Sequence, residues 1–385
     1  MLDLSFQLPS PNSKYFYDIF FSMTHSLIST ETGDRSPQNS TFNYPLVKPS
    51  SAASSFPSST SNVHSLAVLW AKKYLVSVEG KDESSPLKNA RNLKDVTSVE
   101  GRKQTADKLM QNLTLASAQA WTQTEILLGE ELRRHKVNAD LVNPLEIAAD
   151  TRHLFQKTLA AYGEECTPRR LSVIVGKDFG EVRHKYTCVD RRAIGFVSMQ
   201  FHYTGEKLLT WLSPAEQQLW KPYLKVMDDH MYIPLHAAYE AAGNHPDDSP
   251  ILAAVQHFLP KITKIATSVC QQVCRLNPNH KTYSGLLSDS TVRIATIRDV
   301  EMFQIYLCLC VLENDICSVQ RELFPLCVML YPRLGVTWGL VQEMLKIIGW
   351  EMYNCLSAED MAVFLPYLRI LTEMFSVEVF EALGH

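Results

Sequence analysis

Apolar residues in the second half of the chain recur with the period of an α-helix, and this periodicity constrains the fold most strongly. Over residues 251–273 they follow one another at steps of three or four positions, which places them on one helix face. The members of this stripe are Ile251, Val255, Phe258, Ile262, Ile265, Val269 and Val273. Pro260 falls within it and predicts a kink or a restart of the helix. Because such a stripe must be buried against other helices, a packed helical domain is predicted.

Helix-start signals support this interpretation. Ser213 precedes a proline and stands three residues before Glu216, the pattern of an N-cap serine with a reciprocal acid in the first turn. Ser357 stands three residues before Asp360 in a similar arrangement. These signals and the apolar stripes predict about six or seven helices, and no strand, over residues 191–380.

The first half of the chain divides into different parts. Residues 31–62 are rich in Ser, Thr, Pro and Asn, so they bury too little apolar surface to offset the entropy of ordering. A helical pattern follows, with one face formed by Leu109, Leu113, Ala116, Ala120 and Leu127. β-Branched residues then flank Gly176 and Gly180, which is typical of a hairpin. The chain is therefore predicted to be mainly α, with a largely disordered arm (1–62), a helical segment (63–165), a short β-hairpin or extended linker (166–190) and a helical domain (191–385).

Composition excludes several classes of function. The 37 basic and 41 acidic residues nearly cancel, which argues against the positive surface that nucleic acid requires. Nine cysteines in largely apolar contexts indicate reduced thiols and a cytoplasmic setting. No apolar run approaches the roughly 18 residues that span a bilayer, so the protein is not expected to cross a membrane.

Short motifs that could bind metals or phosphate are incomplete. His236 and Glu240 would share a helix face, but one pair leaves a coordination sphere unfilled. Cys270 and Cys274 are interpreted as buried small hydrophobes. The GKDFG segment at 176–180 lacks the spacing of a phosphate-binding loop and is interpreted as a turn. No metal site and no hydrolase motif are predicted.

Arg298 and Asp299 stand directly before a long apolar run and are the strongest candidate site residues. An acid in the first turn of a helix is stabilised by unpaired amides and the helix dipole, which explains the pair without a ligand. An arginine fork also suits carboxylates, and an aspartate accepts from N–H donors. The pair could therefore hold a tetrapyrrole with propionates and pyrrole nitrogens.

Five segments around this pair carry a family resemblance. They are LPKITKIATSVCQQVCRLNP (259–278), TYSG (282–285), IRDVEMF (297–303), LYPRLGVTWGLVQEMLKIIGWEM (330–352) and SAEDMAVFLPYLRILTEMFS (357–376). In order and spacing they resemble the phycobiliproteins, the globin-like subunits of cyanobacterial phycobilisomes. In that family a Cys-x-Arg-Asp motif opens the chromophore helix, and the last helix carries a tyrosine, as Tyr367 does here. The resemblance covers about residues 205–380 and implies a globin-like fold for residues 191–380.

The resemblance also implies a ligand and the way in which that ligand would be bound. Arg298 and Asp299 match the residues with which the family contacts bilin propionates and pyrrole nitrogens. The family ties its bilin to a cysteine two residues before the arginine, and Thr296 occupies that position here. Because a hydroxyl replaces a thiolate poorly in this addition, either no chromophore or a non-covalently bound bilin is expected. Cys308 and Cys310 lie on the same helix, are expected to pack in the core, and are the alternative attachment points.

Three functions remain open at this point. The favoured one is a non-catalytic, phycobilisome-related binding protein, chromophore-free or binding bilin non-covalently, that contacts photosynthetic antenna proteins in the cytoplasm or at the thylakoid surface. A globin-like sensor that binds haem or a lipid-like ligand would use His257 or His280 as iron ligand.

The third function is an enzyme that attaches or detaches bilins. Its acid and base would come from His202, Asp228, Asp229 and His230, although solvated charge on a helix surface explains this cluster equally well.

Residues 193–212 are more apolar than a lone exposed helix should be. Two explanations stay open, a homo-oligomer in which a partner subunit covers them, or a monomer in which residues 63–162 fold back over them.

Overall fold

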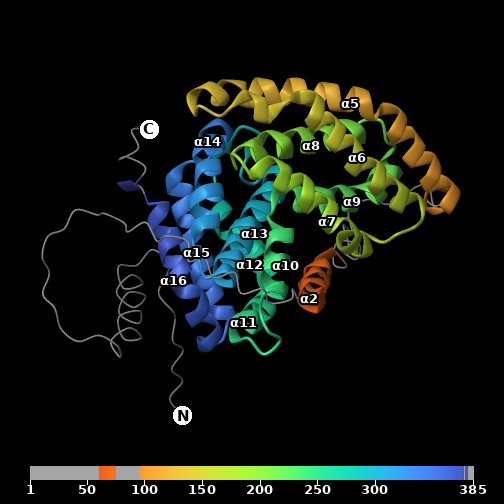
Figure 1. The fold of residues 1–385 in the computed structure, drawn as a ribbon. Coiled ribbons are helices and arrows are strands. Elements are labelled where there is room, and N and C mark those ends of the chain that lie inside the picture. The colour runs from red at the N-terminus through yellow and green to blue at the C-terminus, as the bar shows by residue number, and fades with distance from the viewer. Residues whose placement is uncertain (1–59, 75–94, 377, 380–385) are drawn as a thin grey trace, which may run out of the picture. The chain divides into compact units, whose positions relative to one another are not determined.

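The structure is a computed structural model that describes residues 60–74, 95–376, 378 and 379. The disordered arm predicted for residues 1–62 lies outside the described residues, except that residues 60–62 belong to the first described helix. The described chain is mainly helical, as predicted (Figure 1).

Helices make up nearly all of the described elements. Before residue 190 they are α2 (Thr60–Ala71), α5 (Val99–Arg134), the 3-10 helix η1 (Ala139–Val142), α6 (Pro144–Gly163) and α7 (Pro168–Thr187). After it come α8 (Ala193–Leu209), α9 (Pro214–Tyr232), α10 (Leu235–Gly243), α11 (Pro250–Phe258), the 3-10 helix η2 (Leu259–Lys261), α12 (Ile262–Leu276), β1 (Lys281–Thr282), β2 (Gly285–Leu286), α13 (Ser290–Glu313), the π-helix η3 (Val319–Leu323), α14 (Phe324–Leu334), α15 (Trp338–Cys355) and α16 (Ala358–Met374).

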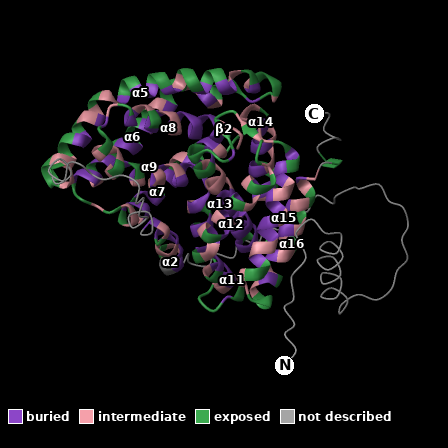
Figure 2. Ribbon diagram, turned by 180° about the vertical axis from the view of Figure 1, so that it is seen from behind, coloured by how far each residue is buried: buried purple, intermediate pink, exposed green. Residues whose placement is uncertain are grey.

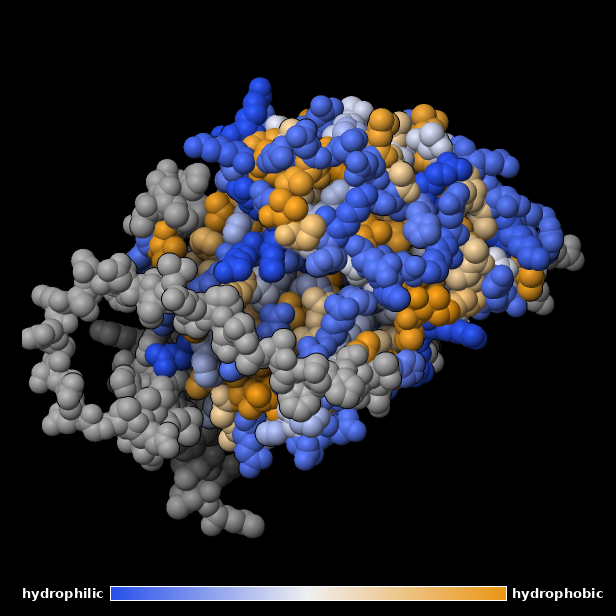
Figure 3. Space-filling view, in the orientation of Figure 1, coloured by the Kyte–Doolittle hydropathy of each residue, from blue (hydrophilic) through white to orange (hydrophobic). Residues whose placement is uncertain are grey.

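The long helix α5 packs along α8, across the boundary expected at residue 190 (Figure 1). The predicted face of α5, from Leu109 to Leu127, is buried, whereas the residues on its outer side are mainly hydrophilic (Figure 3). Every residue from Ala193 to Phe201 on α8 is buried. The described residues belong to one compact unit, so the apolar surface of α8 is covered within the chain. Of the two explanations for that surface, the fold-back one matches the structure, and no partner subunit is needed to cover it.

The short hairpin or extended linker predicted for residues 166–190 is wrong, because Pro168–Thr187 form the helix α7. Thr167 caps this helix by accepting a hydrogen bond from the Arg170 amide. Gly176 and Gly180 lie one turn apart and allow close packing against His230 of α9 and His236 of α10. A Cβ at Gly180 would lie under 3.0 Å from the Cβ and Cγ atoms of His236. These glycines therefore serve helix packing and not a turn.

The described residues contain a small antiparallel hairpin elsewhere, between α12 and α13, in a region where no strand was predicted. Lys281 pairs with Leu286 and Thr282 with Gly285. Gly285 adopts φ +138°, a conformation that L side chains rarely adopt, and a Cβ there would collide with the Asp289 carboxylate. The hairpin turns the chain directly into α13.

Helix α13 forms the centre of the core and is buried almost continuously from Val300 to Leu312 (Figure 2). It begins at Ser290, about two turns before Arg298. The sequence had suggested that Arg298 and Asp299 lie in the first turn of this helix. They lie inside the helix instead. Their placement needs a different explanation from helix capping.

Candidate functional site

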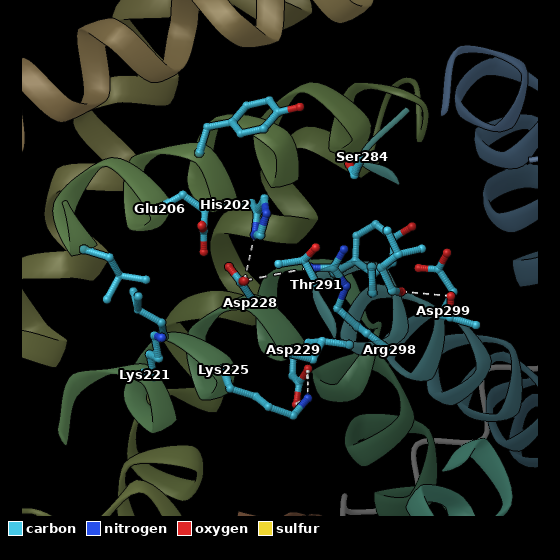
Figure 4. A pocket seen from close by; sticks show the side chains of 18 of the residues that line it. His202, Glu206, Lys221, Lys225, Asp228, Asp229, Ser284, Thr291, Arg298 and Asp299 are labelled. Carbon is cyan, nitrogen blue, oxygen red and sulfur yellow. Dashed lines mark hydrogen bonds and ion pairs between the residues drawn. The ribbon is translucent and has the colours of Figure 1, made fainter. Parts of the chain in front are cut away.

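A cavity of about 1670 Å³ lies among α8, α9, the β1–β2 hairpin, α13, α14 and α15 (Figure 4). Cavities that hold drug-sized ligands measure about 300–1,000 Å³, so this one has room for an extended molecule. Apolar side chains from α9, α13 and α15 make up part of the wall, among them Leu224, Val292, Leu340, Val341 and Met344. The cavity therefore combines an apolar lining with the charged residues described below.

Thr296, Arg298 and Asp299, which the sequence singled out, all line this cavity. Thr296 and Asp299 are three residues apart on α13 and so share one side of the helix. The Thr296 hydroxyl donates a hydrogen bond to the Val292 carbonyl of its own helix. The structure thus brings the three residues together on one wall.

Arg298 is a partly buried cation with few partners. Its guanidinium lies 4.4 Å from the centroid of the Tyr232 ring, and its side chain is 13% exposed. The carboxylate with which it pairs belongs to Asp228, at 3.8 Å, and its Nε has no hydrogen-bond partner among the described residues. Unpaired buried N–H groups are costly, so Arg298 is suited to receiving an anion from a ligand.

Asp299 accepts a hydrogen bond from the Tyr232 hydroxyl. Burial raises the pKa of Asp299 to about 6, although Arg298 and the Tyr232 hydrogen bond both lower it. The ionisation of this carboxyl is therefore easily changed near neutral pH by a ligand that donates an N–H or supplies a charge.

Asp228 joins Arg298 to a histidine on the opposite wall. His202 Nδ1 lies 2.9 Å from Asp228 Oδ2, the same oxygen that lies 3.8 Å from Arg298 (Figure 4). His202 comes from α8 and Asp228 from α9, and among the described histidines His202 is the one that lines the cavity. The sequence analysis had named both residues as candidate acid and base of a bilin-handling enzyme, without pairing them.

The histidines considered as haem ligands lie elsewhere. His257 is exposed and pairs with Asp360 at 3.2 Å. His280 Nε2 lies 2.9 Å from the Gly335 carbonyl oxygen. Neither is among the residues that line the cavity, so the structure offers no iron site built on them.

Asp229 and His230 are buried, which corrects the interpretation of the cluster 228–230 as solvated surface charge. Asp229 lies 2.9 Å from Lys73 and 3.1 Å from Lys225, and Lys73 lies 2.7 Å from Glu301. Burial alone would raise the pKa of Asp229, but the two lysines hold it well below its usual value. This network attaches the chain after α2 to α9 and α13.

His230 makes a buried hydrogen bond with Ser172 of α7, with Nε2 2.9 Å from the hydroxyl. Burial lowers the pKa of His230 to about 4, so the ring is neutral at physiological pH. With Ser172 1% and His230 2% exposed, the pair is closed to a substrate and serves packing.

The sequence analysis missed Lys73, Lys225 and Glu301. One signal was present, because Glu301 stands within the apolar run of α13, and a carboxylate buried in such a run requires a cationic partner. Nothing in the sequence identified the partner, since Lys73 lies more than 200 residues earlier.

No cysteine is among the described residues that line the cavity. Cys308 and Cys310 are buried on α13, as predicted, and burial raises the pKa of Cys310 to about 12 and that of Cys308 still further. Thiols of this kind are poor nucleophiles, so neither Cys308 nor Cys310 offers a site for thioether attachment.

In the described residues no group of three or more His, Cys, Asp or Glu side chains is placed to hold a metal ion. His236 and Glu240 form an isolated pair at 3.3 Å. None of the described helices is long and apolar enough to cross a membrane.

No family model, curated protein or solved structure matches this chain. The resemblance to phycobiliproteins therefore stays a prediction.

Proposed function

We propose that this protein binds a linear tetrapyrrole non-covalently in the cavity and acts through contacts with photosynthetic antenna proteins. The observation that carries the proposal is the position of Arg298 and Asp299 on one cavity wall, with the Arg298 guanidinium poorly paired. The globin-like arrangement expected for residues 191–380 belongs to the same proposal.

The chemistry of the wall matches this class of ligand. A propionate can accept hydrogen bonds from the guanidinium of Arg298, and pyrrole N–H groups can donate to Asp299, since both residues line the cavity. The apolar lining from α9, α13 and α15 suits flat, weakly polar rings. The large volume accommodates an extended ligand, whereas a compact metabolite would leave much of it filled by water.

Non-covalent binding is proposed because of what occupies the attachment position. The Thr296 hydroxyl donates to a backbone carbonyl, and the described cavity wall contains no cysteine. A bound bilin would therefore separate from the polypeptide in denaturant. A pigment that stayed attached would contradict this part of the proposal.

The test is a titration of purified protein with biliverdin, followed by the change in visible absorbance. Arg298→Gln removes a charged hydrogen-bond donor, which contributes about 1.5–3 kcal/mol, so Kd should rise roughly 10- to 150-fold. Asp299→Asn should weaken binding less, because the amide still hydrogen-bonds. Arg293→Gln is the matched control, since Arg293 is exposed on the same helix and does not line the cavity.

Unchanged binding by Arg298→Gln, or an equal loss in Arg293→Gln, would contradict the proposed site. The partner is tested separately, by co-sedimentation of the protein with isolated phycobilisomes. Sedimentation with phycobilisomes is expected, and its absence would overturn the proposed partner while leaving the ligand proposal in place.

A further inference from the structure

The His202–Asp228 pair gives the cavity a proton acceptor. An ionised carboxylate only accepts hydrogen bonds, so at 2.9 Å from Asp228 the neutral ring of His202 carries its proton on Nδ1. Nε2 then presents an unprotonated lone pair. No partner for Nε2 exists among the described residues, and the side chain is 34% exposed, so water can reach it. This is the arrangement of an oriented general base.

The same carboxylate brings an electrophilic group close to that base. Asp228 Oδ2 lies 2.9 Å from His202 and 3.8 Å from Arg298, so the base and the guanidinium flank a single oxygen (Figure 4). Arg298 lines the cavity, and its guanidinium, 3.8 Å from the carboxylate with which it pairs, can stabilise negative charge that develops on a carbonyl oxygen. The apolar residues of α9, α13 and α15 are suited to holding the body of a hydrophobic substrate.

We infer that the cavity hydrolyses carboxylic esters with an apolar acyl chain, with His202 as general base, Asp228 as its positioning residue and Arg298 as the stabiliser of the oxyanion. His202 Nε2 takes a proton from a water molecule while the water oxygen bonds to the ester carbonyl carbon. The tetrahedral intermediate then collapses, the carbon–oxygen bond to the alcohol breaks, and the imidazolium returns its proton to the leaving oxygen. One ester and one water give one acid and one alcohol, with no redox change.

This inference goes beyond the proposed binding function and does not depend on it. A bilin that occupies the cavity would act as a competitive inhibitor of hydrolysis, but neither result requires the other. His202→Gln should lose hydrolysis and retain biliverdin binding through Arg298. The two proposals therefore fail separately.

The experiment measures p-nitrophenolate release from p-nitrophenyl acetate, butyrate and octanoate by the full chain. Because any accessible imidazole hydrolyses such esters slowly, the controls are His236→Gln and His257→Gln. Both histidines pair with a carboxylate, at 3.3 and 3.2 Å, and lie outside the cavity. Removal of a general base costs about 100-fold or more in rate, so His202→Gln should fall by that factor while both controls keep the wild-type rate.

Asp228→Asn tests the positioning role with a side chain of the same size. It should lower kcat with little change in KM, because it disturbs the base and not the acyl site. In His202→Gln, the solvent isotope effect of the wild-type reaction should disappear. Circular dichroism and unfolding midpoints establish that each variant is folded. Any of three results would overturn the inference. They are hydrolysis no faster than that by free imidazole with all of the esters, a wild-type rate in folded His202→Gln, and an equal loss of rate in the control variants.

Discussion

Gly180→Ala should destabilise the protein, because the α7 backbone approaches α10 too closely for a side chain. The added Cβ would lie under 3.0 Å from the Cβ and Cγ atoms of His236, which belong to the stiff base of that side chain. Overpacking costs about 1–3 kcal/mol, and replacing glycine by alanine within a helix returns about 1 kcal/mol. If the clash costs about 3 kcal/mol, the upper end of the overpacking range, the free energy of unfolding should fall by about 2 kcal/mol.

Two other glycines serve as matched controls. A Cβ at Gly176 would meet His230 Cε1 at 3.5 Å, and one at Gly129 on α5 would meet Glu125 Cγ at 3.5 Å, both ordinary contacts. These two substitutions should be neutral or should stabilise by up to about 1 kcal/mol through helix propensity. The measurement is urea denaturation followed by circular dichroism, with the midpoints compared at a common m-value.

The double variant Gly180→Ala with His236→Ala should recover most of the loss, since it removes the colliding atoms. The His236–Glu240 pair lost in that variant lies largely at the surface and is worth little. If Gly176→Ala and Gly180→Ala were equally destabilising, residues 176–180 would behave as a turn that needs glycine at both positions. That result would refute the packing of α7 and favour the hairpin that the sequence alone had suggested.

Two further predictions concern buried charges. Asp299 has a folded pKa of about 6, above its unfolded value of about 3.9, so its contribution to stability is complete below pH 4 and is lost as pH rises through 6. Asp299→Asn should therefore gain about 3 kcal/mol relative to wild type between pH 3 and 8 in urea unfolding, and parallel pH curves would contradict the assigned pKa. Lys73→Met leaves the buried Asp229 and Glu301 carboxylates with Lys225 as their remaining cation, so the free energy of unfolding should fall by about 3–5 kcal/mol. Lys72 is exposed, so Lys72→Met should change the free energy of unfolding little. Equal unfolding midpoints of the two lysine variants would show that the network contributes nothing.

The helices of the second half were predictable because local signals agree with tertiary packing there. The capping box at Ser213 and Glu216 forms as the sequence implied, and Ser357 caps α16 through the Asp360 amide. The stripe is buried from Val255 to Val273, with a 3-10 turn at Pro260 between α11 and α12. In these segments the residues that favour a helix also supply the buried face.

Helix α7 was not predictable in this way because its local signals conflict with its packing. Val173, Ile174 and Val175 favour extended structure, and the two following glycines favour a turn. In the folded chain, Val175 is buried and the glycines admit His230 and His236 from helices more than 40 residues later. The sequence gives no sign of those partners, so tertiary contacts outweigh local preference.

The candidate site shows the same limit at the level of single residues. Asp228 and Asp229 are adjacent, but neighbours on a helix point about 100° apart, so one pairs with His202 beside the cavity and the other enters the lysine network. The apolar context of α13 drew attention to Arg298, which lines the cavity, whereas its pairing with Asp228 depends on how α9 crosses α13. A linear pattern can therefore identify a charge that needs a partner. Only the packing of helices decides whether that partner lies at hydrogen-bond distance, as for Asp229, or is a carboxylate farther away, as for Arg298.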